Sequence, residues 1–219
     1  MKKLHLFAER QRFPNKTLGA KDFRGKPYRE RYEFAFKEFA YDFRLNDQSL
    51  LLFKKAGEDI HNGSLNFSHL EAPTSVMSYE LFVGSLEGLS PGEPDYDKAL
   101  EAWGDALRPD YEVYVQSLDL KSAVTPLRYD CQAADYRAGL HPASHMHFGF
   151  ESQIRVGTRR VVTPLGFVLF VVRQRYPTEW SQLLRWENCA QLCRNVRVEL
   201  NEVDERYWCD GDEQELFLA

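Results

Sequence analysis

Side chains that could carry out chemistry are concentrated in one segment of the chain. Its charged and imidazole-bearing residues are, in order, Arg128, Asp130, His141, His145, His147 and Arg155. Residues two apart on a β-strand project from the same face, so Arg128 goes with Asp130, and His145 with His147, if both segments are strands. We therefore expect one polar face that collects both pairs, together with Arg155, if these strands are neighbours.

This combination of side chains favours cleavage of a phosphodiester bond without a metal. An imidazole with its ordinary pKa of about 6.5 suits general acid and base catalysis. A guanidinium group suits the binding of a phosphoryl group. In this interpretation His145 and His147 are the base and the acid, Asp130 orients one imidazole, and Arg128 or Arg155 contacts the phosphate. Further substrate contacts are expected from His141 and Arg173, and no cofactor is required.

Two other interpretations use the same residues. A divalent metal could be held by His145 and His147 as an H-x-H pair, with His141 or Asp130 as the third ligand. Alternatively, Arg128 and Asp130 form a structural ion pair, and the histidines hydrogen-bond around a loop that contains a proline. The residues alone leave these alternatives open.

The hydrophobic pattern predicts the elements that must position this segment. The expected fold class is α+β, with a mainly antiparallel sheet packed by a buried central helix at about 164–176 and by further helices. Thr163 and Pro164 mark the start of that helix as a side-chain cap and a proline in the first turn. Strands are expected at 32–36, 39–45, 49–53, 65–67, 124–131, 145–150, 153–156, 196–200 and 206–209. The other helices are expected at 78–83, 95–107, 111–120 and 178–193. Histidines 61 and 69 are assigned to turns.

Length and composition predict one domain over residues 1–219. A chain of 219 residues with 43% hydrophobic residues can bury one sizeable core. The 28% of charged residues, and the lack of an apolar run of about 20 residues, argue against a membrane protein. The first residues carry too many charges for a signal peptide, and the four cysteines include no C-x2-C pair. We expect a cytoplasmic protein with reduced cysteines.

The charge of −5 is unevenly distributed. Residues 1–37 contain seven more basic than acidic residues, which defines a basic N-terminal arm at about 1–31. Residues from 199 onward contain eight acidic residues and one arginine, which defines an acidic C-terminal segment at about 199–219. A basic arm can contact an anionic polymer, so nucleic acid is one expected partner, and a protein of the same system is another.

Several motifs resemble an uncharacterised bacterial family, a domain of unknown function. They are V-T-P-L-R-Y-D at 124–130, L-H-P-A-S-H-M-H-F-G at 140–149, T-P-L-G-F at 163–167 and R-Q-R-Y-P-T-E-W at 173–180. Segments 39–46 and 65–68 are similar as well, so the resemblance covers most of the chain. It implies kinship and no particular reaction.

The R-Y-D and H-P-x-x-H-x-H runs also look like small toxin families of bacterial toxin–antitoxin and phage-defence loci. We therefore expect a nuclease of a defence or toxin-type system. The alternative is a non-catalytic subunit of a defence complex, in which the basic arm and the aromatic strands near 32–43 bind nucleic acid or protein.

Overall fold

A computed structural model describes residues 6–10, 25–57, 63–150, 152 and 154–213. In this part of the chain a seven-stranded sheet runs in the order of the sequence, and each strand is antiparallel to the next. The strands are β1 (Phe7–Arg10), β2 (Phe43–Leu45), β3 (Leu50–Ala56), β4 (Ser64–Leu70), β5 (Leu127–Cys131), β6 (Ser144–Phe148) and β7 (Arg155–Gly157). With the helices described below, this confirms the predicted α+β class.

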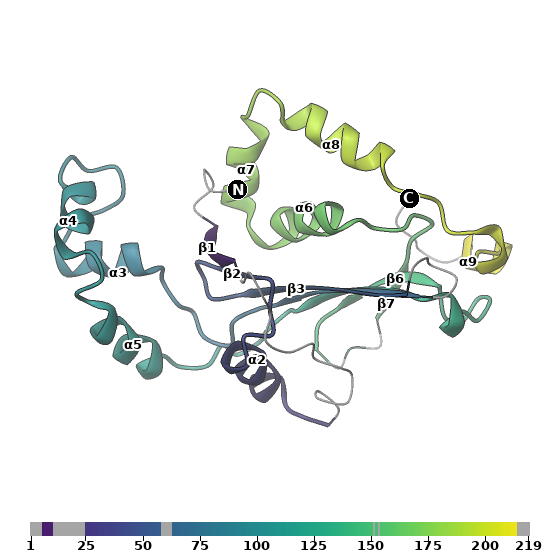
Figure 1. The fold of residues 1–219 in the computed structure, drawn as a ribbon, viewed down its shortest axis with the longest axis horizontal. Helices are drawn as coiled ribbons and strands as arrows, with labels where there is room; N and C mark the ends of the chain where they lie inside the picture. Colours follow the sequence, from purple (N-terminus) through teal and green to yellow (C-terminus); the bar gives the residue numbers. More distant parts are fainter. Residues whose placement is uncertain (1–5, 11–24, 58–62, 151, 153, 214–219) are drawn as a thin grey trace.

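Helix α6 (Pro164–Arg175) covers one face of the sheet, and α7 (Pro177–Leu184) and α8 (Cys189–Val198) pack around α6 on the same side (Figure 1). The Thr163 side chain accepts a hydrogen bond from the backbone N–H of Gly166, as expected for an N-cap. Phe167 and Val171 of α6 are buried against sheet residues that include Tyr129 and Met146. The prediction of a buried central helix at about 164–176 is confirmed.

Helix α2 (Tyr28–Lys37) lies on the other face of the sheet (Figure 1). Its buried residues Tyr28, Tyr32 and Ala35 pack around Leu50 and Leu52 of β3. The predicted strand at 32–36 is therefore wrong. Its aromatic residues do alternate along the sequence, but the buried positions are spaced by four and three residues, which is the period of a helix.

Helices α3 (Tyr79–Leu86), α4 (Tyr96–Trp103) and α5 (Arg108–Ser117) form an arm between β4 and β5, placed beside the sheet (Figure 1). The arm has a small core of its own, which contains Phe82, Val83 and Tyr111. The helix predicted at 95–107 ends earlier, at Trp103, and the one predicted at 111–120 begins earlier, at Arg108. Helix α4 ends because its C-cap, Gly104, takes a positive φ of 49°, outside the right-handed helical region. Helix α5 can start at Arg108 because Pro109 stands in its first turn, where its missing N–H costs no hydrogen bond.

The C-terminal predictions fail in three places. The helix predicted at 178–193 is two helices, α7 and α8. The strand predicted at 196–200 begins inside α8, where Val196 is buried. The strand predicted at 206–209 overlaps the 3-10 helix η3 (Glu205–Tyr207), because the Asp204 side chain accepts a hydrogen bond from the backbone N–H of Arg206 and starts a turn. The short helices η2 (Ala133–Asp135) and α9 (Asp210–Glu213) complete the fold.

The charged termini are described only in part. Within the basic arm predicted at 1–31, residues 1–5 and 11–24 lie outside the described residues, and residues 28–31 belong to α2. Within the acidic segment, residues 214–219 lie outside them as well. None of the helices formed by the described residues has the length and hydropathy needed to cross a membrane. The four cysteines, all described, are free thiols.

Candidate functional site

Cross-strand pairing brings the sequence-predicted residues together on the face of the sheet opposite α6. In the β5–β6 register, Arg128 lies opposite His147 and Asp130 lies opposite His145. The residues that alternate with them, Tyr129 and Met146, point into the α6 core, because successive side chains of a strand project to opposite faces. The expected shared polar face is therefore present.

His145 is held in one tautomer by the backbone. Its side chain is 3% exposed, and its Nδ1 lies 2.8 Å from the carbonyl oxygen of Pro142. A carbonyl oxygen only accepts hydrogen bonds, so Nδ1 carries the hydrogen and Nε2 carries the lone pair when the ring is neutral. Burial, assisted by the neighbouring His147, lowers the pKa of His145 to about 4. The Nε2 lone pair is thus present at neutral pH, and it faces His147.

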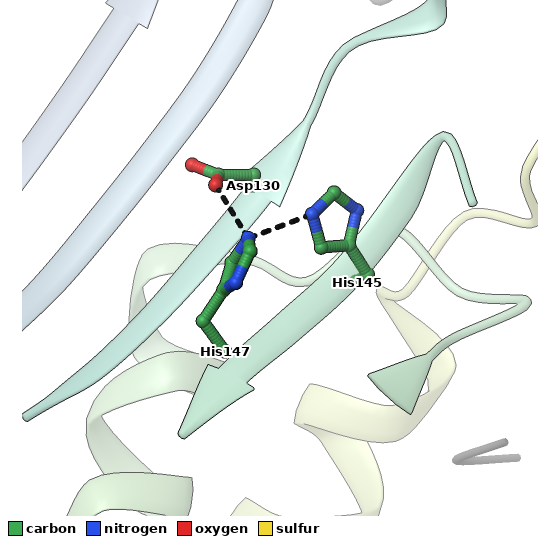
Figure 2. Close-up of side chains that lie close together, drawn as sticks. All are labelled: Asp130, His145 and His147. Atoms are coloured by element: carbon green, nitrogen blue, oxygen red, sulfur yellow. Dashed lines mark hydrogen bonds and ion pairs between the residues drawn. The ribbon is translucent and has the colours of Figure 1, made fainter. Parts of the chain in front are cut away.

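The Nε2 atom of His147 lies at the centre of the cluster. It is 2.9 Å from Nε2 of His145, 3.1 Å from Oδ2 of Asp130 and 2.9 Å from Nη2 of Arg128. Figure 2 shows the two histidine rings and the carboxylate converging on this point. The histidine lone pair and the carboxylate both require an N–H on His147, whereas the guanidinium requires a lone pair there. One ring nitrogen cannot meet both demands at once.

Asp130 is held between two further side chains. Its Oδ2 lies 2.8 Å from Nε of Arg128, and its Oδ1 accepts a hydrogen bond from the amide of Asn66 on β4. Burial by itself would raise the pKa of Asp130, but the hydrogen bond from His147 and the charge of Arg128 outweigh it, so this pKa lies below its ordinary value. The carboxylate is ionised at neutral pH. The Arg128 side chain is 48% exposed, so its guanidinium is accessible from solvent.

The three residues predicted to bind substrate, His141, Arg155 and Arg173, lie at different positions relative to the cluster. The His141 ring packs edge-on against His145, with their centroids 4.8 Å apart, and it lines a hollow of about 320 Å³. Arg155 is exposed on β7 and lies opposite His147, so it flanks the cluster. Arg173 lies on α6, which covers the other face of the sheet, and the structure does not bring it to the histidines.

Sequence reasoning missed Asn66 and misplaced His69. Asn66 lies opposite Asp130 in the β4–β5 register and hydrogen-bonds it. The alternation of Leu65, Asn66, Phe67 and Ser68 was a signal that could have found it, because it places Asn66 on the polar face. His69 was assigned to a turn, but it lies in β4 with 1% exposure. His61 lies outside the described residues.

Asp130, His145 and His147 form a group of the kind that can hold a metal ion. One potential ligand atom from each residue lies within 4.8 Å of the other two. Two imidazole nitrogens and a carboxylate oxygen form a donor set that suits transition metals better than magnesium or calcium. Chemically, the cluster offers an accessible guanidinium beside three electron-rich atoms.

Comparison with known proteins gives a family and no activity. The sequence model of a family described as "Uncharacterized conserved protein (DUF2290)" matches residues 7–210, from β1 to the start of α9. The match thus includes the sheet and the whole cluster. No curated protein and no solved structure matches the chain.

Proposed function

We propose that this chain, which belongs to the family of uncharacterized conserved proteins DUF2290, hydrolyses phosphodiester bonds in nucleic acid, with the β5–β6 cluster as its reaction centre. The observation that carries the proposal is the position of His147 Nε2. It is within 3.1 Å of a guanidinium, a carboxylate and a second imidazole, all on one face of the sheet.

The charges of the cluster suit a phosphodiester. Arg128 is half exposed, and Arg155 is exposed on the neighbouring strand, so two guanidinium groups flank the imidazoles on the same face. Arginine binds phosphate oxygens through paired, charge-assisted hydrogen bonds. Such groups also stabilise the negative charge that develops on the phosphoryl oxygens during cleavage.

The rest of the cluster suits activation of water. In hydrolysis the oxygen of water forms a bond to phosphorus and releases a proton, while the P–O ester bond breaks and the leaving oxygen takes up a proton. Asp130, His145 and His147 present electron-rich atoms at which a water molecule can be held and its proton accepted. The guanidinium groups and the water-activating groups are thus adjacent, as an in-line attack on a bound phosphate requires.

The biological setting that we propose is a bacterial defence or toxin-type system. It is supported by the local resemblance of the R-Y-D and H-P-x-x-H-x-H runs to toxin families of such loci.

The alternative is a non-catalytic subunit that binds nucleic acid or protein. The aromatic residues near 32–43, which the sequence predicts as docking strands, lie on and after α2, where Tyr32 and Tyr41 are buried. The feature that favours this alternative is instead the α3–α5 arm. It exposes large apolar side chains, namely Leu81, Leu86, Trp103 and Val113.

A cleavage experiment separates the two functions. The purified chain is incubated with labelled single-stranded and double-stranded RNA and DNA, with EDTA or with added Zn²⁺, Mn²⁺ or Mg²⁺. The His145→Ala/His147→Ala variant should lose cleavage while it keeps nucleic-acid binding and its circular dichroism spectrum. Arg197→Ala, an exposed arginine on α8, is the matched control and should cleave normally. Binding by wild type without cleavage of any substrate would overturn the enzymatic proposal in favour of the alternative.

A further inference from the structure

We infer that Asp130, His145 and His147 bind one divalent transition-metal ion of the Zn²⁺ or Mn²⁺ class. This inference deepens the proposed function, and its catalytic consequence rests on that function, whereas the binding itself can be measured without any substrate. In this inference the two histidines are metal ligands and not a metal-independent acid and base. The attacking water is then held and activated by the bound ion, in place of direct contact with the three side chains.

The distances fit a site that closes around an ion. With metal–nitrogen bonds of about 2.0–2.1 Å, two ligand atoms of a tetrahedral site lie about 3.3 Å apart. His145 Nε2 and His147 Nε2 are 2.9 Å apart, and His147 Nε2 and Asp130 Oδ2 are 3.1 Å apart. Two of the three separations are therefore within a few tenths of an ångström of this value. The third pair, the ligand atoms of His145 and Asp130, lies within 4.8 Å, and side-chain rotation has to bring these two atoms closer together around the ion.

Hydrogen bonds around the cluster point the ligand atoms inward. Metal-binding histidines ordinarily donate their other ring N–H to a carbonyl or carboxylate, which fixes the tautomer. His145 does this through Nδ1 and the carbonyl of Pro142. The Asn66 amide holds the second carboxylate oxygen of Asp130 and leaves Oδ2 directed at His147. Two of the three ligands thus have an outer partner of the kind that metal sites use.

A cation also resolves the conflict at His147. Three electron-rich atoms, two of them buried histidine nitrogens, converge on one point, and a single N–H on His147 cannot satisfy both of its neighbours well. A metal ion accepts all three lone pairs together. The arrangement therefore costs less free energy with an ion than without one.

Arg128 is the group that competes for this position. Its guanidinium contacts both Asp130 and His147, but its side chain is 48% exposed and can turn toward solvent when an ion binds. In that position it remains beside the site and faces any phosphate that reaches the metal. Removal of Arg128 should therefore preserve metal binding or strengthen it. If Arg128 and Asp130 formed only a structural ion pair and the cluster bound no metal, the Arg128→Ala variant would show no affinity for the ion.

Three protein ligands leave an open coordination position. Structural zinc sites have four protein ligands, whereas catalytic sites have three and keep one position for water or substrate. Asp130 retains 24% exposure, so solvent reaches this side of the cluster. A metal ion at such a position lowers the pKa of bound water and polarises a phosphoryl oxygen.

The test is binding of metal by the full chain after dialysis against EDTA and removal of the chelator. Isothermal titration with ZnCl₂ and with MnCl₂ should show one ion per chain. Asp130→Asn and His145→Gln should each weaken that binding by at least about 100-fold, and Asn66→Ala by about 10–100-fold, as for other outer partners. Arg128→Ala should bind at least as tightly as wild type.

The cysteines provide the necessary control. Cys189 and Cys193, one turn apart on α8, are free thiols that could bind Zn²⁺ outside the cluster. A Cys189→Ser/Cys193→Ser chain should therefore keep the one-ion site. With Co²⁺ it should show visible absorption bands without the charge-transfer band of a thiolate ligand. If the circular dichroism spectrum of Asp130→Asn or His145→Gln differs from that of wild type, His147→Gln is titrated in its place.

The outcomes distinguish a failure of the metal inference from a failure of the proposed function. The metal inference is overturned if the stripped chain takes up no ion, or if Asp130→Asn and His145→Gln bind as wild type does. It is also overturned if nucleic acid is cleaved in EDTA and this cleavage is lost in His145→Gln. Binding of one ion without cleavage of any nucleic acid supports the metal site and overturns the proposed function.

Discussion

His69 should make the stability of the fold fall as the pH falls below 7. It is 1% exposed, and its Nδ1 has no hydrogen-bond partner among the described residues. Its Nε2 lies 3.2 Å from the hydroxyl of Tyr176, which donates to Asp47. Burial lowers the pKa of His69 to about 4 and outweighs the opposing charges of Asp47 and, to a smaller extent, Glu71. The positive charges of Arg175 and Lys121 lower this pKa further.

The direction and size of the effect follow from proton linkage. In the unfolded chain the pKa of His69 is near its ordinary value of 6.5. Between 6.5 and about 4 the unfolded chain therefore binds more protons than the folded chain, so acid favours unfolding. The stability is fully present above the unfolded pKa and declines as the pH falls toward the folded pKa. Integration from pH 7 to pH 5 gives a loss of about 2 kcal/mol from this residue.

The assay is urea unfolding at pH 7 and at pH 5, followed by the fluorescence of the four tryptophans. The His69→Gln variant keeps an amide that can hydrogen-bond Tyr176 but does not titrate. Other groups contribute to both proteins, so the difference between their pH dependences isolates His69. Wild type should lose about 2 kcal/mol more than the variant over this interval. Equal losses in the two proteins would show that His69 does not cause this pH dependence.

Three further perturbations have calculable outcomes. Phe167→Ala empties a fully buried position of α6 and should cost about 3–5 kcal/mol in urea unfolding, and a cost below about 1 kcal/mol would contradict the core assignment. Glu71→Gln removes a buried carboxylate 2.6 Å from Arg175 and should cost about 3–5 kcal/mol, whereas Glu33→Gln, in an exposed helical pair, should cost less than about 0.5 kcal/mol. Arg128→Gln should weaken nucleic-acid binding at low salt, and it should reduce by about one the slope of the logarithm of the binding constant against the logarithm of the salt concentration. An unchanged slope would show that Arg128 does not contact a phosphate group of the nucleic acid.

The four central residues of the site were predictable because they follow a period of two. The spacing of Arg128 and Asp130, and of His145 and His147, fixes which side chains share a face once both segments are strands. The start of α6 was equally predictable, since Thr163 and Pro164 form a local signal that needs no tertiary information. The pairing of β5 with β6 was an inference that the register confirms.

Other features depend on tertiary packing, which the sequence pattern does not contain. Residues 32–36 alternate as a strand would, but the sheet surface formed by Leu50 and Leu52 selects the helical face of Tyr28, Tyr32 and Ala35 instead. Residues 196–200 contain two valines and a leucine, yet α8 runs to Val198. Val196 is buried and Val198 is exposed, as on a helix that packs along one face. The convergence of Arg128, Asp130 and His145 on His147 Nε2 could not be predicted from the sequence, because it depends on the rotamers of these side chains.

The role of the β5–β6 cluster is tested most directly by the initial rate of nucleic-acid cleavage by His145→Gln, measured at saturating substrate with Mn²⁺ or Zn²⁺ present. We expect wild type and Arg197→Ala to cleave at rates within about twofold of each other, and His145→Gln to cleave about 10²–10⁴ times more slowly with its fold intact. A His145→Gln variant that cleaves as fast as wild type would contradict the assignment of the β5–β6 cluster as the reaction centre.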